Sequence, residues 1–200
     1  MKKTLIALAA LTISGVASAA SVDNVSVGFT DVEDYQGITV GVEKSITESV
    51  YVGANVQALE HVDDADKTAQ DFSAKVGALH ALSATHNLYG EVGVGHVVLD
   101  GFENEAGKVV KQSDDYASLE VGVKGDLSQK APIQYSAFVG SKAYTDLDNT
   151  YYVGADMDYA VTDTFAVGVG YKFEAYDSND QSLYGEENES QFFVQTKFKF

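Results

Sequence analysis

Apolar and polar residues alternate along nearly the whole chain after its first twenty residues. A period of two is typical of β-strands that have one apolar and one polar face. The pattern predicts ten strands, each close to the 9–11 residues that a tilted strand needs to cross a bilayer. Their ranges are 22–30, 36–44, 50–59, 71–82, 88–99, 116–125, 133–144, 151–159, 165–176 and 190–200. We therefore expect an all-β protein with ten strands, and eight is the alternative number.

The two faces of these strands differ in kind. One face is apolar, beginning with Val25, Val27 and Phe29, and no Asp, Glu, Lys or Arg falls on it between the first and last apolar residue of each predicted strand. The other face carries eleven glycines, which are Gly28, Gly41, Gly53, Gly77, Gly93, Gly95, Gly122, Gly140, Gly154, Gly168 and Gly170. A soluble barrel needs bulky apolar filling inside, so small residues on the polar face favour a barrel with lipid outside.

Charges on the glycine-rich face are balanced. Its six acids are Glu43, Glu91, Glu120, Asp156, Asp158 and Glu174. Its six bases are Lys75, Lys124, Lys142, Lys172, Lys197 and Lys199. In a narrow lumen, opposite charges can pair away from bulk water. We predict that these twelve residues form a charge network inside a transmembrane antiparallel up-and-down barrel.

The connections alternate in length. Short turns are expected at 45–49, 83–87, 126–131 and 160–164, and three of them share a pattern, as in Ile46-Thr47-Glu48-Ser49-Val50. The other connections are mostly longer and acidic, at 31–35, 60–70, 100–115, 145–150 and 177–189. In outer-membrane barrels short turns are periplasmic and longer loops extracellular. We therefore expect both termini in the periplasm.

The first twenty residues have the features of a cleaved export signal. Lys2 and Lys3 precede an apolar run at 5–16, and small residues follow at 17–20. The run is too short for a spanning helix, which needs about 20 residues. Residues 21–200 should then form a single barrel domain. Loss of the two lysines changes the formal charge from −17 to −19, which argues against nucleic acid as a partner.

The last strand ends on alternate aromatic or apolar residues, Phe192, Val194, Phe198 and Phe200. This ending resembles the terminal signal that the barrel-assembly machinery reads. With the export signal and the strand pattern, the chain resembles the small outer-membrane β-barrel superfamily, which includes the OmpA-type transmembrane domain, OmpX, Ail and opacity proteins. Typical members have eight strands. The resemblance implies a monomer in a Gram-negative outer membrane, surrounded by lipid and lipopolysaccharide and delivered by periplasmic chaperones.

Candidates for catalysis are few. His61 near Asp63 and Asp64 echoes the Asp-His pair of an omptin-type barrel protease, but no matching second cluster is visible. His96 lacks the neighbouring serine of a lipid A deacylase. We interpret these, together with His80 and His86, as surface or interfacial histidines. No catalytic residue, cofactor site or metal site is expected.

The acidic loops allow two interpretations. Asp63, Asp64, Asp66, Glu186 and Glu187 are solvated surface charges, or they share divalent cations with lipopolysaccharide phosphates. Two functions are compatible with the pattern as a whole. The first is a structural or surface-interaction protein with a charge-paired lumen and acidic loops. The alternative is a small passive pore for small solutes, in which the glycine-lined wall leaves space, although open channels usually have 16 or more strands.

Overall fold

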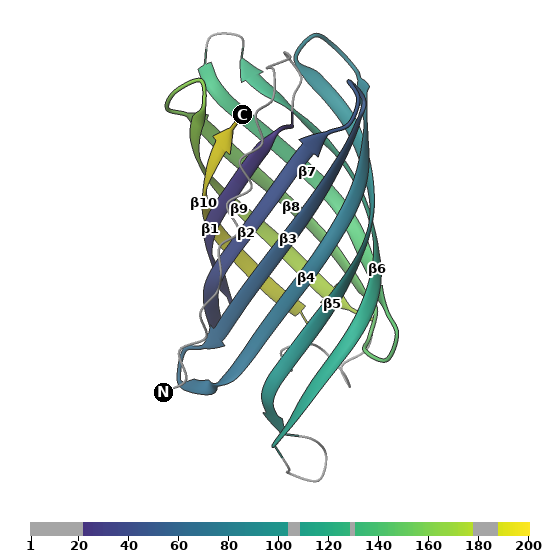
Figure 1. Cartoon of the computed structure of the whole chain (residues 1–200), viewed down its shortest axis with the longest axis vertical. Coiled ribbons are helices and arrows are strands. Elements are labelled where there is room, and N and C mark those ends of the chain that lie inside the picture. The colour runs from purple at the N-terminus through teal and green to yellow at the C-terminus, as the bar shows by residue number, and fades with distance from the viewer. Residues whose placement is uncertain (1–21, 104–108, 129–130, 178–187) are drawn as a thin grey trace.

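The computed structural model describes residues 22–103, 109–128, 131–177 and 188–200. Ten antiparallel strands form one closed barrel, in which neighbours in sequence pair and β1 pairs with β10 (Figure 1). The strands are β1 (Asn24–Val32), β2 (Tyr35–Ser45), β3 (Val50–His61), β4 (Asp64–Ala81), β5 (His86–Glu103), β6 (Val109–Ser128), β7 (Ala131–Tyr144), β8 (Thr150–Ala160), β9 (Phe165–Tyr176) and β10 (Asn188–Lys199). The predicted fold class and the strand number of ten are confirmed. The export signal at 1–20 lies outside the described residues.

Closure joins the two ends of the chain. Asn24 at the start of β1 lies opposite Lys199 at the end of β10, and their pairing continues to Val32 opposite Gln191. Every strand therefore has a hydrogen-bonded neighbour on both sides, which a strand needs where no water is available. Asn24 and Lys199 also mark one end of the barrel, at the top of Figure 1, and we call it the inner end. No helix in the described ranges is long and apolar enough to cross a membrane.

The inner turns explain the repeated sequence pattern. The hydroxyl of Thr47 accepts hydrogen bonds from the backbone amides of Ser49 and Val50, at 3.3 and 3.0 Å. Ser83 and Thr162 occupy the same place in their turns and accept the corresponding pairs of amides. A Ser or Thr side chain here replaces a backbone partner that a tight turn cannot supply. The three turns are therefore built alike.

Two of the predicted long loops are wrong. Residues 60–70 and 100–115 are mostly strand, because β3 and β4 pair as far as His61 and Asp64, and β5 and β6 as far as Glu103 and Val109. The hairpin of β5 and β6 projects beyond the barrel at the outer end, at the bottom of Figure 1. Beyond the membrane both faces of a strand can be polar. Backbone pairing therefore continues where the apolar alternation that revealed the strands has stopped.

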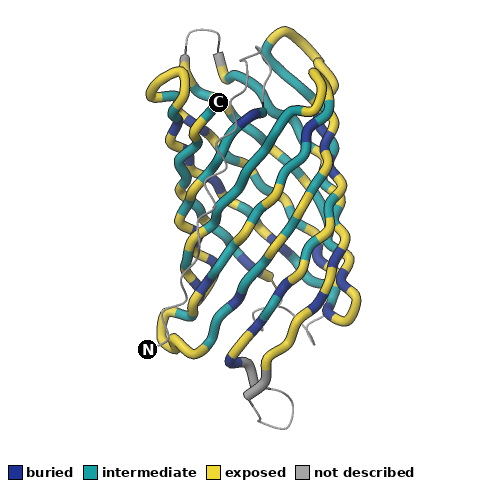
Figure 2. The backbone as a smooth tube through the Cα atoms, in the orientation of Figure 1, coloured by how far each residue is buried: buried dark blue, intermediate teal, exposed yellow. Residues whose placement is uncertain are grey.

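The apolar face points outward on every strand. Large apolar side chains such as Val92 and Val94, 59% and 63% exposed, alternate with lumen residues that are buried or half-buried. Figure 2 shows exposed residues alternating with buried or half-buried ones along the strands. A soluble protein does not expose a continuous apolar surface of this kind. The exterior is that of a barrel surrounded by lipid.

Candidate functional site

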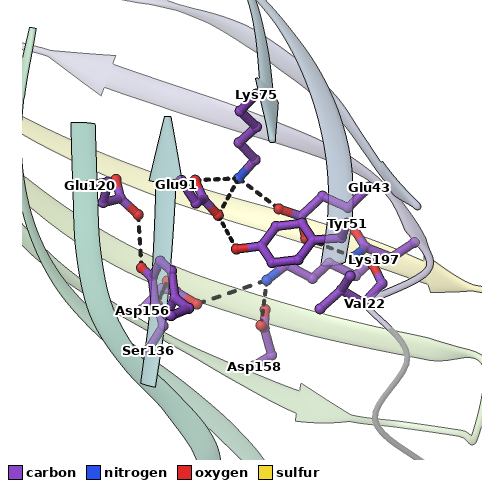
Figure 3. A network of polar contacts seen from close by, with 12 residues as sticks. Val22, Glu43, Tyr51, Lys75, Glu91, Glu120, Ser136, Asp156, Asp158 and Lys197 are labelled. Carbon is purple, nitrogen blue, oxygen red and sulfur yellow. Dashed lines mark hydrogen bonds and ion pairs between the residues drawn. The ribbon is translucent and has the colours of Figure 1, made fainter. Parts of the chain in front are cut away.

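Lys75 on β4 is the centre of an ion-pair cluster in the inner half of the lumen (Figure 3). Its Nζ lies 2.7 Å from Oε1 of Glu43 on β2 and 3.0 Å from Oε2 of Glu91 on β5. The hydroxyl of Tyr51 on β3 also donates to Glu91. The lysine therefore neutralises part of the charge of two carboxylates and links β2, β4 and β5 from inside.

Lys197 on β10 forms a second cluster in this half of the lumen (Figure 3). Its Nζ lies 2.6 Å from Oδ2 of Asp158 and 3.8 Å from Oδ1 of Asp156, both on β8. Ser136 on β7 donates to Asp156, and Gln195 donates to Asp158 over 3.3 Å. Because β9 lies between β8 and β10, this cluster links two strands that are not direct neighbours.

Three more of the predicted network residues contact neutral partners. Glu120 accepts a hydrogen bond of 2.8 Å from the hydroxyl of Tyr89. The Nζ of Lys124 lies over the rings of Tyr51 and Tyr89, 4.5 and 4.9 Å from their centroids. Lys199 donates to Oε1 of Gln134 over 2.7 Å, at the inner end. Cation–π contacts of this kind replace part of the hydration that a lysine loses in a narrow lumen.

The remaining network residues lie in the outer half. Lys172 and Glu174 form an ion pair of 2.7 Å along β9, and Lys142 lies 3.8 Å from the same carboxylate. Lys142 also lies 3.6 Å from Asp71, which the sequence analysis left out of the network. Asp71 begins its predicted strand and has the parity of Lys75, so the alternation itself could have assigned it to the lumen.

A cluster of buried apolar residues lies at the outer mouth of the barrel, between these charges and the outer end. All its members face the lumen or the mouth, and they are Val32, Tyr35, Leu59, Ala69, Val97, Leu99, Tyr116, Tyr144 and Leu147. We call this cluster the outer cap. The alternation did not reveal the outer cap. Five of its residues lie at the ends of predicted strands, or in the two segments that were predicted as loops and form strands. Burial removes the apolar surface of these side chains from water, which stabilises the cluster.

The β7–β8 connection contributes Leu147 to the cap. The Asp114 carboxylate accepts hydrogen bonds from the amides of Asp146 and Leu147, at 2.9 and 2.8 Å. The side chain of Asn149 accepts from the amide of Tyr144 over 3.2 Å. Leu147 is only 8% exposed. The connection is therefore folded into the mouth and held there by one carboxylate.

Six of the lumen glycines are covered by aromatic rings. Each ring belongs to the residue directly opposite on the paired strand, and the pairs are Tyr51 with Gly77, Tyr89 with Gly122, Tyr116 with Gly95, Phe138 with Gly154, Tyr152 with Gly140, and Phe193 with Gly170. A Cβ at any of these glycines would overlap the ring. At these six positions the space that the missing side chain leaves is occupied by an aromatic ring, whereas Gly28, Gly41, Gly53, Gly93 and Gly168 have no ring among their nearest atoms.

A small cavity of about 20 Å³ remains between the outer charges and the cap. Its wall includes Val97 from the cap and Lys142, Lys172 and Glu174 from the charge cluster. A water molecule needs about 10–15 Å³ of such space, so this cavity has room for about one water molecule.

The predicted histidine and terminal residues lie at the surface. Phe192, Val194 and Phe198 point outward from β10, and the ring of Phe200 lies 5.0 Å from Nζ of Lys44. His61 packs edge-on against Tyr35, and His86 contacts the hydroxyls of Ser83 and Thr85 in a turn. Both His80 and His96 point outward.

The acidic residues at the outer end do not form a metal-binding group in the described part of the chain. No group of three or more His, Cys, Asp or Glu side chains there is arranged to hold a metal ion. Asp63, Asp64 and Asp66 lie at the β3–β4 tip, where Asp64 approaches Lys67 at 3.9 Å. Glu186 and Glu187 of the proposed cation cluster lie outside the described residues.

Solved structures similar to this chain are outer-membrane barrels. The NanC porin matches with a TM-score of 0.51 and 9% identity over 88% of this chain and 99% of its own. The KdgM porin in complex with disordered oligogalacturonate has the same TM-score and coverage at 6% identity. LpxR from Salmonella typhimurium gives a TM-score of 0.53 at 9% identity over 89% of this chain and 100% of its own. By sequence, neither a protein-family profile nor a curated protein matches the chain. At such identities the likeness shows the fold alone, that of an outer-membrane β-barrel.

Proposed function

We propose that this protein is an integral outer-membrane barrel with a sealed lumen, whose role is structural and surface-directed. The observation that carries the proposal is the outer cap, in which lumen-facing Leu59, Val97 and Leu99 are buried with Leu147 across the mouth. A channel for polar solutes needs a wetted mouth, and this mouth is apolar. Below the cap, charge clusters and aromatic rings occupy the lumen.

The position of the barrel in the membrane follows from its two ends. We place the inner end, with its three uniform short turns, in the periplasm and the projecting β5–β6 hairpin outside the cell. The acidic residues of the outer connections then face the medium and the lipopolysaccharide sugars. This orientation also places Phe200 where the barrel-assembly machinery would meet it after export, with periplasmic chaperones as earlier partners. We expect the barrel to act as a monomer.

The kinship that we propose is with outer-membrane barrels in general. The OmpA, OmpX and Ail relatives that the sequence resembles typically have eight strands, the lower end of the range for such barrels, whereas this barrel has ten. Neither a catalytic residue nor a cofactor is part of the proposal.

A passive pore is the second candidate, because two of the barrels with this fold are porins. A pore would require the outer cap to open, and the β7–β8 connection is the segment whose displacement would open it. Leu147 enters the cap from that connection, and Asp114 holds it there. The pore hypothesis therefore predicts conductance that depends on this contact.

Planar-bilayer recording separates the two functions. We expect the wild-type barrel to insert without conducting. A variant that combines Leu99→Ala and Leu147→Ala in the outer cap with Tyr51→Ala and Tyr89→Ala deeper in the lumen should conduct, and shows that an open barrel of this size is detectable. Insertion is verified independently by resistance to protease and by heat-dependent mobility on gels. Steady wild-type conductance would contradict the sealed lumen and support the pore.

A further inference from the structure

A shallow groove runs along the outer surface of the barrel between β3 and β7. Its volume is about 690 Å³, within the range of pockets that take small molecules. The floor consists of small outward side chains, Ala54, Ala74, Ala117 and Ala143, and the larger Val56, Phe72 and Val94 border it. The groove exists because alanines replace the bulkier residues that cover the wall elsewhere.

A polar pair stands at one end of this groove. His96 on β5 and Asp115 on β6 are directly opposite in register, and Nδ1 of the histidine lies 2.7 Å from Oδ1 of the aspartate. The pair is exposed on the lipid side, at 46% and 79% of the two side chains. Thr145 borders the same end and donates both its amide and its hydroxyl to the carbonyl of Asp115. Asp115 lies just before the sixth predicted strand, which explains why the apolar face seemed free of charge.

The position of the His96–Asp115 pair along the barrel axis favours an amphiphilic ligand, with a polar head and an apolar chain. His96 lies ten residues along β5 from its first residue, His86, and a tilted strand crosses the bilayer in about 9–11 residues. The polar pair is therefore at the outer boundary of the apolar belt, and the alanine floor extends from it into the belt. An acyl chain fits the groove while a polar head meets the pair.

The chemistry of the His96–Asp115 pair favours some lipid headgroups over others. Because Nδ1–H of the ring donates to Asp115, Nε2 and the second carboxylate oxygen are both acceptors, and two neighbouring hydroxyl groups can each donate to one of them. A phosphate alone would be repelled by Asp115. In a Gram-negative outer membrane, lipids of the outer leaflet carry a phosphorylated glucosamine disaccharide with several acyl chains, so the hydroxyl groups of the sugars, and not their phosphates, would meet the pair.

We infer that the groove binds one molecule of lipid A, with an acyl chain over the alanine floor and sugar hydroxyls on the His96–Asp115 pair. The inference rests on the membrane position and orientation proposed above. It assigns a specific lipid site to one side of the barrel, where an outward polar pair borders an alanine floor.

Native mass spectrometry of the refolded full-length barrel tests the site, with purified lipid A and phosphatidylglycerol as competing probes. We expect one lipid A to be retained by the wild type. Ala74→Phe fills the floor and should weaken retention roughly tenfold, because each methylene that loses its contact weakens binding severalfold. Ala155→Phe on β8 makes the same change on the outward wall away from the groove and should bind as the wild type does.

NMR of the wild-type barrel supplies a readout that needs no variant. Lipid A should shift the ring signals of His96 and leave those of His80, the other outward histidine, unchanged. Equal retention by the wild type and Ala74→Phe, equal binding of phosphatidylglycerol, or equal shifts at the two histidines would each overturn the site. A barrel that fails to insert into vesicles at all would instead contradict the proposed function.

Discussion

The ring of Tyr116 lies over Gly95, its direct partner across β5 and β6, and its hydroxyl donates to Asp71 over 2.7 Å. One residue thus fills the space left by a missing side chain and links the wall to the outer charge cluster. Its neighbour Tyr144, with ring centroids 5.1 Å apart, is buried in the outer cap, but its hydroxyl has no hydrogen-bond partner in the described residues. These contrasts lead to the first two predictions.

Gly95→Ala should destabilise the barrel by about 1–3 kcal/mol, because the new methyl group would displace the Tyr116 ring in a packed lumen. Gly90→Ala is the matched control on the same strand, since the atoms nearest to its added methyl group lie 3.9 Å away. Urea unfolding in detergent micelles, followed by circular dichroism, measures both. Equal midpoints for the two variants would contradict the role of the covered glycines.

Tyr144→Phe and Tyr116→Phe remove the same atom and should have opposite consequences. Loss of the Tyr144 hydroxyl removes a buried polar group without a partner, so stability should stay the same or rise. Loss of the Tyr116 hydroxyl removes a partner of the Asp71 carboxylate and should cost about 1–2 kcal/mol. The difference between the two unfolding free energies is the decisive quantity, and a difference near zero would show that the Tyr116 bond contributes nothing.

Lys75→Met should leave Glu43 and Glu91 without their shared cation. We expect a loss of roughly 2–3 kcal/mol, less than for a fully buried ion pair because 33% of the Lys75 side chain is accessible in the lumen. Lys111→Met at the exposed rim, where the nearest carboxylate oxygen is 3.9 Å away, should have no measurable effect. If adding Glu91→Gln to Lys75→Met restores no stability, uncompensated charge is not the cause.

Asp114→Ala should release the β7–β8 connection from the outer cap. The amides of Asp146 and Leu147 lose their acceptor, so their hydrogen exchange should accelerate by roughly tenfold or more, as expected for loss of a charge-assisted hydrogen bond. Asp126→Ala at the inner end removes an acceptor from Gln134 and serves as the control. Unchanged exchange at both amides in Asp114→Ala would show that the carboxylate does not hold the connection.

Much of the fold could be predicted from the sequence. The period of two assigned each strand residue to one of two faces, and the absence of charge on one face identified the side toward lipid. The repeated Ser or Thr pattern predicted the inner turns, where local hydrogen bonds determine the structure. These features depend on neighbours within a few residues, so a single sequence contains them.

The arrangement across strands was decided by tertiary structure. All six ring–glycine pairs lie within hairpins that join at the outer end, where two of the predicted loops were wrong. Alternation indicates whether a residue faces the lumen or the lipid. Its position along the barrel axis depends on the register between strands, and that register depends on where the outer connections begin. The outer cap, the hold of Asp114 on Leu147 and the pairing of His96 with Asp115 all depend on that position. The sequence by itself therefore determined the barrel and its two faces, whereas closure and register decided which side chains meet in the lumen and at its outer mouth.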